Sequence, residues 1–432
     1  MNLDRSEANI LEEPNKSVYL YKKDSLRSWY VLAILLAINT LNLIDRTLPF
    51  LLIEDIKKDI DLTDTQVGIL GGVAFTLVYA IAGLPIGRLL DRYSRKLILG
   101  TAVMTWGLMT AAGGLAANFM QLATSRIGLA TGEAAALPAA SSMISDIFSP
   151  KRRRTALGVY LMGSSLGLIF GLTVGGQLAV LVSWRKVMFF FAIPALILAG
   201  LLFCTVREPV RDKPDEPGAK VPGAFQAARI LLAIPVFRLN CIALCLTNLS
   251  FSAASSFTPA YAIRRFGLDA AEAGLAIGVV MGLSTGIGAF AGGLLGDFLN
   301  RKDARWSVWL PAICVTVAAP LSMITYTSQS LIGFFGVMAA PFFLFALCVS
   351  STYALAQDLS GPNMRSLGMS ILSFLMFGLG GSLGPVLAGA ISDALSPSMG
   401  PAGLGLSLAL MSVSYLVAGA CWWRASQIFG RS

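Results

Sequence analysis

The fold is decided by a short polar stretch between two long apolar runs, Gly87-Arg88-Leu89-Leu90-Asp91-Arg92-Tyr93-Ser94-Arg95-Lys96. Its pattern, G-x-x-x-D-R-x-x-R-K, returns in the second half of the chain as Gly293-Leu294-Leu295-Gly296-Asp297-Phe298-Leu299-Asn300-Arg301-Lys302. One copy alone is compatible with an ordinary basic loop. Two copies separated by about half the chain length indicate a duplicated fold with two similar halves.

A second pair of turns supports the duplication. The sequence Asp146-x-x-x-Pro150-x-x-x-Arg154-x-x-x-Gly158 is echoed by Asp358-x-x-x-Pro362-x-x-Arg365-x-x-Gly368. Both turns follow a long apolar run, as expected if the halves share one order of spans. The sequence therefore predicts two repeats that have the same order of spans but differ in the residues of their turns.

The composition is that of a polytopic membrane protein. Of the 432 residues, 55% are hydrophobic and only 13% are charged, and the mean hydropathy is +0.71. A water-soluble protein of this composition would lack the polar surface that it needs. The net charge of +9 does not indicate nucleic-acid binding, because most Lys and Arg residues lie in the tails and in alternate loops. This placement is typical of the positive-inside bias.

The apolar runs predict an all-α membrane protein of twelve transmembrane helices in two six-helix halves, each span long enough for a core of about 30 Å. The expected spans are 28–53, 65–90, 97–117, 119–147, 155–181, 184–206, 236–263, 269–296, 305–326, 329–359, 366–392 and 402–427. The domains are then a cytoplasmic tail (1–27), an N-terminal bundle (28–206), a cytoplasmic linker (207–235) and a C-terminal bundle (236–432). An even number of spans places both termini in the cytoplasm. No cleavable signal pattern precedes the first span.

Chemistry at metal or cofactor sites is not indicated. The six cysteines lie in or beside apolar segments without metal-ligand spacing, and the chain has no histidine. We therefore expect no metal and no cofactor, and we do not expect an enzyme. Any proton chemistry must then rest on carboxylates.

Four charged residues lie within predicted spans and away from their ends: Asp45, Arg46, Arg126 and Glu133. An ionisable group at membrane depth costs a few kcal/mol or more, so it usually faces a cavity and has a partner. Arg126 and Glu133 are two helical turns apart, so their backbones are separated by about 10 Å and a partner from the first span is expected. We predict Glu133 as the proton-coupling residue and Asp45 as a secondary acceptor. The alternative is a static ion cluster that holds two helices together.

The predicted spans of the second half keep their acids and bases near their ends. Their interiors offer amides, hydroxyls and many aromatic residues, and we expect them to form a weakly polar wall. The predicted substrate-binding residues are therefore the two arginines together with three polar residues: Arg46, Arg126, Asn42, Asn248 and Tyr353.

Glycines recur every fourth residue in the fifth predicted span, at Gly163, Gly167, Gly171 and Gly175. Such spacing removes side chains from one face and allows another helix to approach closely. We predict Gly167, Gly171 and Gly175 as helix-packing residues. The pattern also resembles the fifth-helix signature of proton-linked antiporters, G-x8-G-x3-G-P-x2-G-G, although Leu172 stands where that signature has proline.

The repeated loop resembles the cytoplasmic loop between helices 2 and 3 of the major facilitator superfamily, and this resemblance extends over the whole chain. Over the first 160 residues the sequence is similar to Spinster-like lipid transporters, through Asn42-Leu43-Ile44-Asp45-Arg46, Gly68-Ile69-Leu70, Arg126-Ile127-Gly128 and Gly132-Glu133-Ala134. Sialin-related anion symporters share the arginine and glutamate of span 4. The resemblance implies alternating access across a central cavity. It also implies a cytoplasmic gate in which Asp91 faces the amino end of helix 11. The predicted gating residues are Asp91, Arg92, Arg95, Asp146 and Arg154.

The sequence therefore predicts a transporter of an amphipathic, anionic, lipid-like molecule such as a lysophospholipid or a sphingoid phosphate. Protons and the lipid bilayer are the expected partners, nucleic acid is not one, and we expect a monomer in the inner (plasma) membrane. The alternatives are a transporter of a small organic anion or drug, and a membrane receptor built on a transporter scaffold.

Overall fold

The computed structural model describes residues 24–209 and 224–429, and within these ranges it leaves a few helical side chains undescribed, those of Asp91 and Arg154 among them. Every regular element in the described part of the chain is helical. Residues 1–23 of the predicted tail, residues 210–223 of the predicted linker, and residues 430–432 lie outside the described residues.

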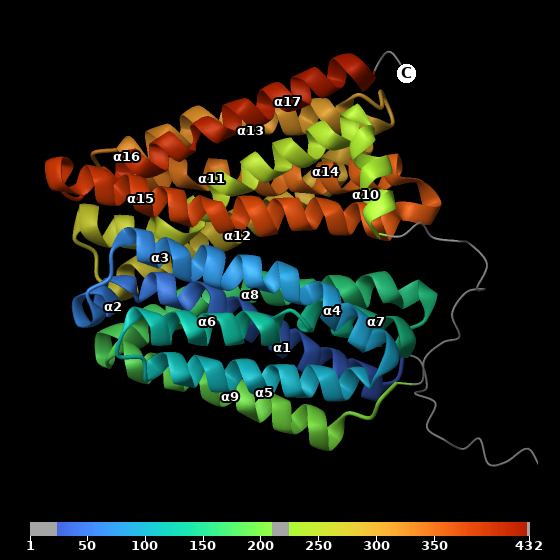
Figure 1. Ribbon diagram of the computed structural model, residues 1–432, viewed down its shortest axis with the longest axis horizontal. Coiled ribbons are helices and arrows are strands. Elements are labelled where there is room, and N and C mark those ends of the chain that lie inside the picture. The colour runs from blue at the N-terminus through green and yellow to red at the C-terminus, as the bar shows by residue number, and fades with distance from the viewer. Residues whose placement is uncertain (1–23, 210–223, 430–432) are drawn as a thin grey trace, which may run out of the picture.

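The N-terminal half forms one bundle, drawn in blue to green in Figure 1. Its elements are α1 (Leu26–Leu51), α2 (Ile53–Ile60), α3 (Asp64–Gly71), η1 (Gly72–Leu77), α4 (Val78–Arg92), α5 (Arg95–Gly114), α6 (Phe119–Glu133), α7 (Ala136–Ile147), α8 (Pro150–Leu181) and α9 (Trp184–Thr205).

The C-terminal half forms a second bundle beside the first, drawn in yellow to red (Figure 1). It follows the short helix α10 (Ala224–Ala233) and contains α11 (Pro235–Phe266), α12 (Ala270–Asn300), α13 (Trp306–Thr327), α14 (Leu331–Ser373), η2 (Phe374–Gly381), α15 (Ser382–Met399), α16 (Ala402–Met411) and α17 (Val413–Phe429). We call the end of the molecule that carries α10 the linker end, and the end that carries α2 the far end.

Twelve transmembrane helices in two halves agree with the prediction, but the fourth span is broken. Among the described residues, eleven helical stretches are each long and apolar enough to cross a membrane. The remaining span is the pair α6 and α7, interrupted at Ala134 and Ala135. The cause is Pro138, which has no N–H to donate to the carbonyl of Ala134 and whose ring clashes with that carbonyl. The predicted span 119–147 therefore has the expected bounds but is interrupted, and the break falls directly after Glu133.

Three further segments differ from the expected pattern. The segment between the first two predicted spans contains the helix α2, and Thr63 at its end forms the N-cap of α3 in a capping box with Gln66. The predicted turn between spans ten and eleven is helical, so α14 includes both its flanks. The eleventh span contains the π-helical stretch η2, which ends four residues before Pro385. A π-helical stretch accommodates a proline whose ring would clash with the carbonyl one turn earlier.

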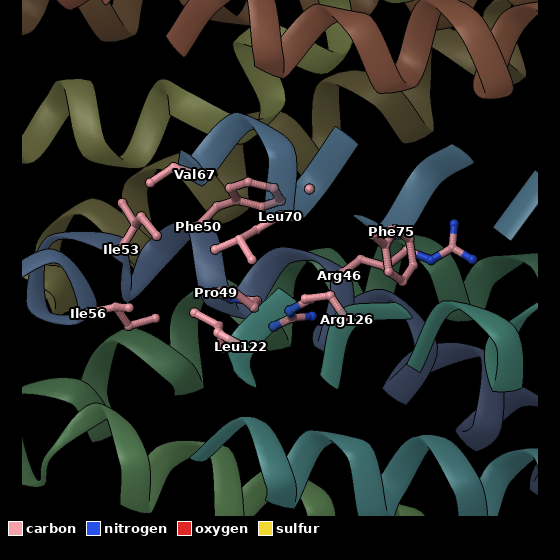
Figure 2. A pocket seen from close by; sticks show the side chains of 11 residues that line it. Arg46, Pro49, Phe50, Ile53, Ile56, Val67, Leu70, Phe75, Leu122 and Arg126 are labelled. Carbon is pink, nitrogen blue, oxygen red and sulfur yellow. The ribbon is translucent and has the colours of Figure 1, made fainter. Parts of the chain in front are cut away.

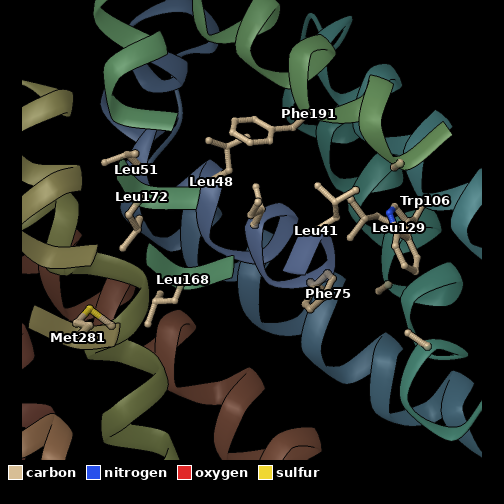
Figure 3. Close-up of a cluster of buried hydrophobic side chains, with 14 of the residues drawn as sticks. Leu41, Leu48, Leu51, Phe75, Trp106, Leu129, Leu168, Leu172, Phe191 and Met281 are labelled. Carbon is tan, nitrogen blue, oxygen red and sulfur yellow. The ribbon is translucent and has the colours of Figure 1, made fainter. Parts of the chain in front are cut away.

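Apolar packing holds each half together and joins the halves at the far end. The larger cluster of buried side chains is centred on α1 and includes Leu48, Trp106 and Leu129 (Figure 3). It reaches across to the second half, where Met281 of α12 is near Leu168 and Leu172 of α8 (Figure 3). A Cβ atom on Gly274 of α12 would lie 2.2 Å from the carbonyl oxygen of Leu172, so the two backbones are in direct contact there. A second cluster lies within the C-terminal half.

Candidate functional site

A cavity of about 390 Å³ lies between the two halves. Its wall mixes one cation with amides, hydroxyls and aromatic rings, and is formed by α1, α3, η1, α4, α7, α8, α11, η2 and α15. The lining residues are Asn39, Asn42, Leu43, Arg46, Thr47, Phe50, Gly71, Phe75, Thr76, Tyr79, Ala136, Leu137, Tyr160, Leu161, Ser164, Asn248, Phe251, Ser252, Ser255, Ser256, Phe377, Gly381 and Pro385. We call it the central cavity.

Arg46 connects the central cavity with a fully buried carboxylate. Its Nε atom lies 2.8 Å from Oε2 of Glu133, and the two side chains are 27% and 0% exposed, respectively. The guanidinium also lies over two rings, 4.4 Å from the centroid of Tyr79 and 5.1 Å from that of Phe75. Aromatic faces attract a cation, so these rings help to hold the arginine at the cavity wall. One face of this ion pair therefore meets the cavity and the other is dry.

The Glu133 carboxylate has hydrogen-bonding capacity to spare. Within the described part of the chain, neither its Oε1 atom nor the Nδ2 atom of Asn42 has a hydrogen-bond partner, and both atoms are buried. Buried polar groups are usually satisfied. Both exceptions belong to the same site, since Asn42 precedes Arg46 by one turn of α1 and Arg46 contacts Glu133.

Asp45 and Arg126 form a second contact on another side of α1. Thr110 donates to Oδ1 of Asp45 at 3.0 Å, and Nη1 of Arg126 donates to the backbone carbonyl of Asp45 at 2.9 Å. Successive residues on a helix point about 100° apart, so Asp45 and Arg46 cannot serve the same partner. Arg126 and Glu133, two turns apart on α6, therefore contact neighbouring residues of α1. Each has a partner from the first span, as expected.

The two arginines also share a small cavity of about 20 Å³ (Figure 2). Its other walls are apolar and come from α1, α2, α3, η1 and α6, including Pro49, Phe50 and Leu70. This volume is sufficient for about one water molecule. Arg126, which is 5% exposed, is thus placed on this smaller cavity, whereas Arg46 lines both.

The predicted substrate-binding residues divide into three groups. Asn42, Arg46 and Asn248 line the central cavity, and Arg126 lines the small one. Asn248 also donates a hydrogen bond of 2.8 Å to the backbone carbonyl of Met376 in η2. Tyr353 is absent from the linings of both cavities, and its hydroxyl lies 3.5 Å from the Met376 sulfur. Sequence reasoning missed the ring pair Phe75 and Tyr79, whose four-residue spacing was the available signal.

The structure describes three of the five predicted gating residues. Arg95 is buried; its guanidinium contacts the carboxylate of Asp146, lies 2.8 Å from Oγ of Ser142 and lies 3.1 Å from Oε1 of Glu208. Arg92 is exposed, and the side chains of Asp91 and Arg154 lie outside the described residues. The contacts named here for Arg95 lie within the N-terminal half and the start of the linker. The gating roles stay predictions.

The sequence does not mark Glu208, because it lies at the start of the linker, far along the chain from the loop that it contacts. Its carboxylate accepts hydrogen bonds from Ser94 Oγ at 2.6 Å and from the backbone N–H groups of Arg95 at 3.1 Å and Lys96 at 2.8 Å. Burial alone would raise the pKa of Glu208, but these bonds to Ser94, Lys96 and Arg95 hold it below its ordinary value. The linker is thereby fastened to the amino end of α5.

The three predicted packing glycines face α1. A Cβ atom on Gly167 would lie 2.3 Å from the carbonyl oxygen of Thr40, and one on Gly171 would lie 3.1 Å from Cα of Ile44. A Cβ atom on Gly175 would lie 2.5 Å from Leu48. The close approach is thus between α8 and α1, in the same half, and it fixes the helix that carries Asp45 and Arg46.

Comparisons with known proteins agree with this architecture. The sequence profile described as Major Facilitator Superfamily matches residues 35–385. An MFS-type efflux pump of Mycolicibacterium smegmatis is 30% identical over 407 residues, which cover 94% of each chain. A hexuronate transporter of Bacillus subtilis is 28% identical over 397 residues, 87% of this chain and 89% of that one.

Among solved structures, a bacterial homolog of the human lysosomal transporter Spinster, in an inward-facing and unoccupied conformation, superposes with a TM-score of 0.86. It is 27% identical, and the match covers 94% of this chain and 98% of that one. The duplicated halves, the cavity between them and these matches lead to one assignment: the chain belongs to the Major Facilitator Superfamily of membrane transporters and resembles its Spinster-like members.

Proposed function

We propose that this protein is a secondary active transporter that moves an amphipathic anion together with protons by alternating access. The observation that carries the proposal is the Arg46–Glu133 ion pair, which is open to the cavity at the arginine and fully buried at the carboxylate. We further propose that the linker end is cytoplasmic, following the positive-inside bias, and that the protein acts as a monomer in the plasma membrane.

Coupling follows from competition for Arg46. A proton on Glu133 removes its charge and weakens its hold on the guanidinium, which is then available to an anionic head group in the cavity. Conversely, an anion that draws Arg46 away leaves a buried carboxylate without its partner, a costly state that proton uptake relieves. Proton binding and anion binding therefore favour each other by the same free energy. This cooperativity supports symport of the anion with a proton, because both are bound in the same state.

The amphipathic character of the substrate is supported by the cavity wall. The polar part of the wall includes Arg46, Asn42 and Asn248. Another part is apolar and includes Phe251 and Phe377. A further cavity of about 330 Å³, with mostly apolar walls, shares Tyr79, Leu137 and Phe377 with the central cavity. A charged head near Arg46 and an apolar body against the rings would suit a lysophospholipid or sphingoid phosphate.

A small organic anion is the second candidate. The hexuronate transporter that matches this chain is named for a polyhydroxylated anion. Several lining residues offer the hydrogen bonds that sugar hydroxyls need, Asn39, Ser164 and Ser255 among them.

The test is transport by the purified protein in vesicles with an imposed pH gradient. A panel of lysophospholipids, sphingoid phosphates and hexuronates separates the two substrate classes. Proton-driven accumulation that needs both Arg46 and Glu133 would support the proposal. Transport of a lipid or sugar without any response to the gradient would refute proton coupling.

A further inference from the structure

The amino end of α3 at the far end is capped from both halves of the protein. Within its own half, Thr63 Oγ1 accepts from the N–H of Gln66 at 3.2 Å, and the Gln66 side chain accepts from the N–H of Thr63 at 3.0 Å. The first four N–H groups of a helix have no intrahelical partner. This capping box leaves the N–H groups of Asp64 and Thr65 to be satisfied by other residues.

Both remaining donors are satisfied by Asp393 of α15, in the opposite half. Its Oδ1 atom accepts from the N–H of Asp64 at 2.9 Å, and its Oδ2 atom accepts from the N–H of Thr65 at 2.7 Å. The Thr65 hydroxyl donates to Oδ2 at 2.5 Å. A carboxylate at a helix amino end also interacts favourably with the helix dipole. One aspartate therefore completes the cap of a helix to which it is not joined.

Two glycines allow this approach. A Cβ atom on Gly389 would lie 2.2 Å from the carbonyl oxygen of Asp64, and one on Gly68 would lie 2.3 Å from the carbonyl oxygen of Pro385. Gly389 precedes Asp393 by four residues, which is one helical turn along the same face. Gly389 allows α3 to lie directly against α15. Asp393, one turn later on α15, accepts from the N–H groups of α3 that have no intrahelical partner.

Gly389-x-x-x-Asp393 has the spacing of Gly87-x-x-x-Asp91 and Gly293-x-x-x-Asp297. The far-end copy is engaged, whereas a Cβ atom on Gly87 or Gly293 would meet nothing within 4 Å. The same short pattern is thus present at both ends of the molecule, and in this structure its glycine is covered only at the far end.

A buried ion cluster reinforces the far-end contact. Arg264 of α11 makes two bonds of 2.7 Å to the carboxylate of Asp64, which also accepts from Lys57 at 2.6 Å and from Ser392 at 2.7 Å. The Asp64 side chain is 2% exposed. Like the Asp393 cap, the bonds from Arg264 and Ser392 join the two halves, so separation of the halves at this end must break both.

We propose that Gly389 and Asp393, with Asp64 and Thr65 as their partners, form the gate that holds the far end of the transporter closed. In the outward-open state the N–H groups of Asp64 and Thr65 pass from Asp393 to water. None of the gate residues lines the central cavity, so a substitution at the gate leaves the Arg46–Glu133 pair and the cavity wall in place.

The test measures the distance between the two halves at the far end. Spin labels are introduced as an unnatural amino acid at Lys58 and Ser398, which are both exposed, so that the native cysteines remain. In Asp393→Asn the carboxylate loses its charge but keeps its shape. Loss of a helix cap of this kind corresponds to a roughly 5- to 30-fold change in an equilibrium ratio. We expect the ratio of separated to closed molecules to rise by that factor.

Gly389→Ala and Thr65→Val test the two remaining elements of the gate. Gly389→Ala forces the helices apart and is expected to act in the same direction as Asp393→Asn, while Thr65→Val removes one hydroxyl and is expected to act more weakly. Asp297→Asn makes the matched chemical change at an exposed aspartate of the linker end and should leave the far-end distances unchanged. Wild-type distances in Asp393→Asn, or an equal shift in Asp297→Asn, would overturn the proposal.

Discussion

Replacement of Glu133 by glutamine tests the coupling of proton and anion most directly. The substitution keeps the shape of the side chain and removes its charge for good, as a bound proton would. The Nε–Oε2 distance of 2.8 Å places the two charge centres about 4 Å apart, where unit charges attract by about 4 kcal/mol at an effective dielectric constant of about 20. The arginine is 27% exposed, so water in the cavity screens part of this attraction.

The net coupling is therefore expected in the usual range of about 1–3 kcal/mol, which corresponds to a roughly 5- to 150-fold change in anion affinity. In the wild type, affinity should rise by such a factor as the pH falls and Glu133 takes up a proton. Glu133→Gln should bind with the low-pH affinity at every pH, because Arg46 is no longer held by a charged partner. It should also fail to accumulate substrate against a gradient, while it still exchanges substrate across the membrane.

The measurement is calorimetric titration of the substrate into protein in nanodiscs at several pH values. Glu272→Gln is the matched control, since the same change is made at an exposed glutamate of the far end. If Glu133→Gln keeps the pH dependence of the wild type, the proton resides elsewhere and Asp45 becomes the next carboxylate to test. If neither protein responds to pH, the ion pair is a static link between α1 and α6.

Three further substitutions address packing, the linker and the cavity wall. Gly171→Leu should destabilise the protein by about 1–3 kcal/mol or block its movement, because a side chain there meets α1 at Ile44 and Thr47; Gly158→Leu, on the same helix with open space around it, is the control, and normal transport by Gly171→Leu would contradict the packing. Glu208→Gln should cost about 1 kcal/mol of stability at neutral pH. Because the pKa of Glu208 is lowered in the folded state, its contribution is complete above the unfolded value of about 4.3 and is lost as the pH falls through the folded value, so the melting curves of variant and wild type should converge in acid. Tyr353→Phe should change substrate affinity by less than about twofold, since Tyr353 lies outside the cavity linings; a larger loss in a binding titration would show that another state brings it to the substrate.

The sequence was sufficient to predict the fold because membrane spans leave a strong and simple signal. Each span is a long, predominantly apolar run, and the duplicated loops divide the runs into two halves. Where prediction failed, a local feature outweighed the average over a span. Pro138 breaks the fourth span inside an otherwise continuous apolar run, and its effect reaches back one turn to Ala134. The mean hydropathy of the run does not indicate this break. The break nevertheless ends α6 at the residue that carries the buried carboxylate.

For the candidate site, the sequence identified the charged residues but not how they pair. Charge at membrane depth marked Asp45, Arg46, Arg126 and Glu133 as a group, since only four such residues lie within the predicted spans and away from their ends. Which of them pair could not be predicted, because neighbouring residues on a helix point about 100° apart and a pairing depends on how α1 is rotated against α6.

Rotation of helices also explains two placements that residue type alone does not predict. Tyr353 has the polarity of a binding residue but faces into its own half toward Met376, and polarity alone does not tell which face of a helix meets the cavity. Asp393 lies at the end of the eleventh predicted span and has the same four-residue spacing to a glycine as Asp91. That spacing matters only when the amino end of another helix lies opposite, and at the far end α3 supplies it through the N–H groups of Asp64 and Thr65. A motif of one small and one acidic residue thus acquires its role from the helix that meets it, which is information that a single segment of sequence does not contain.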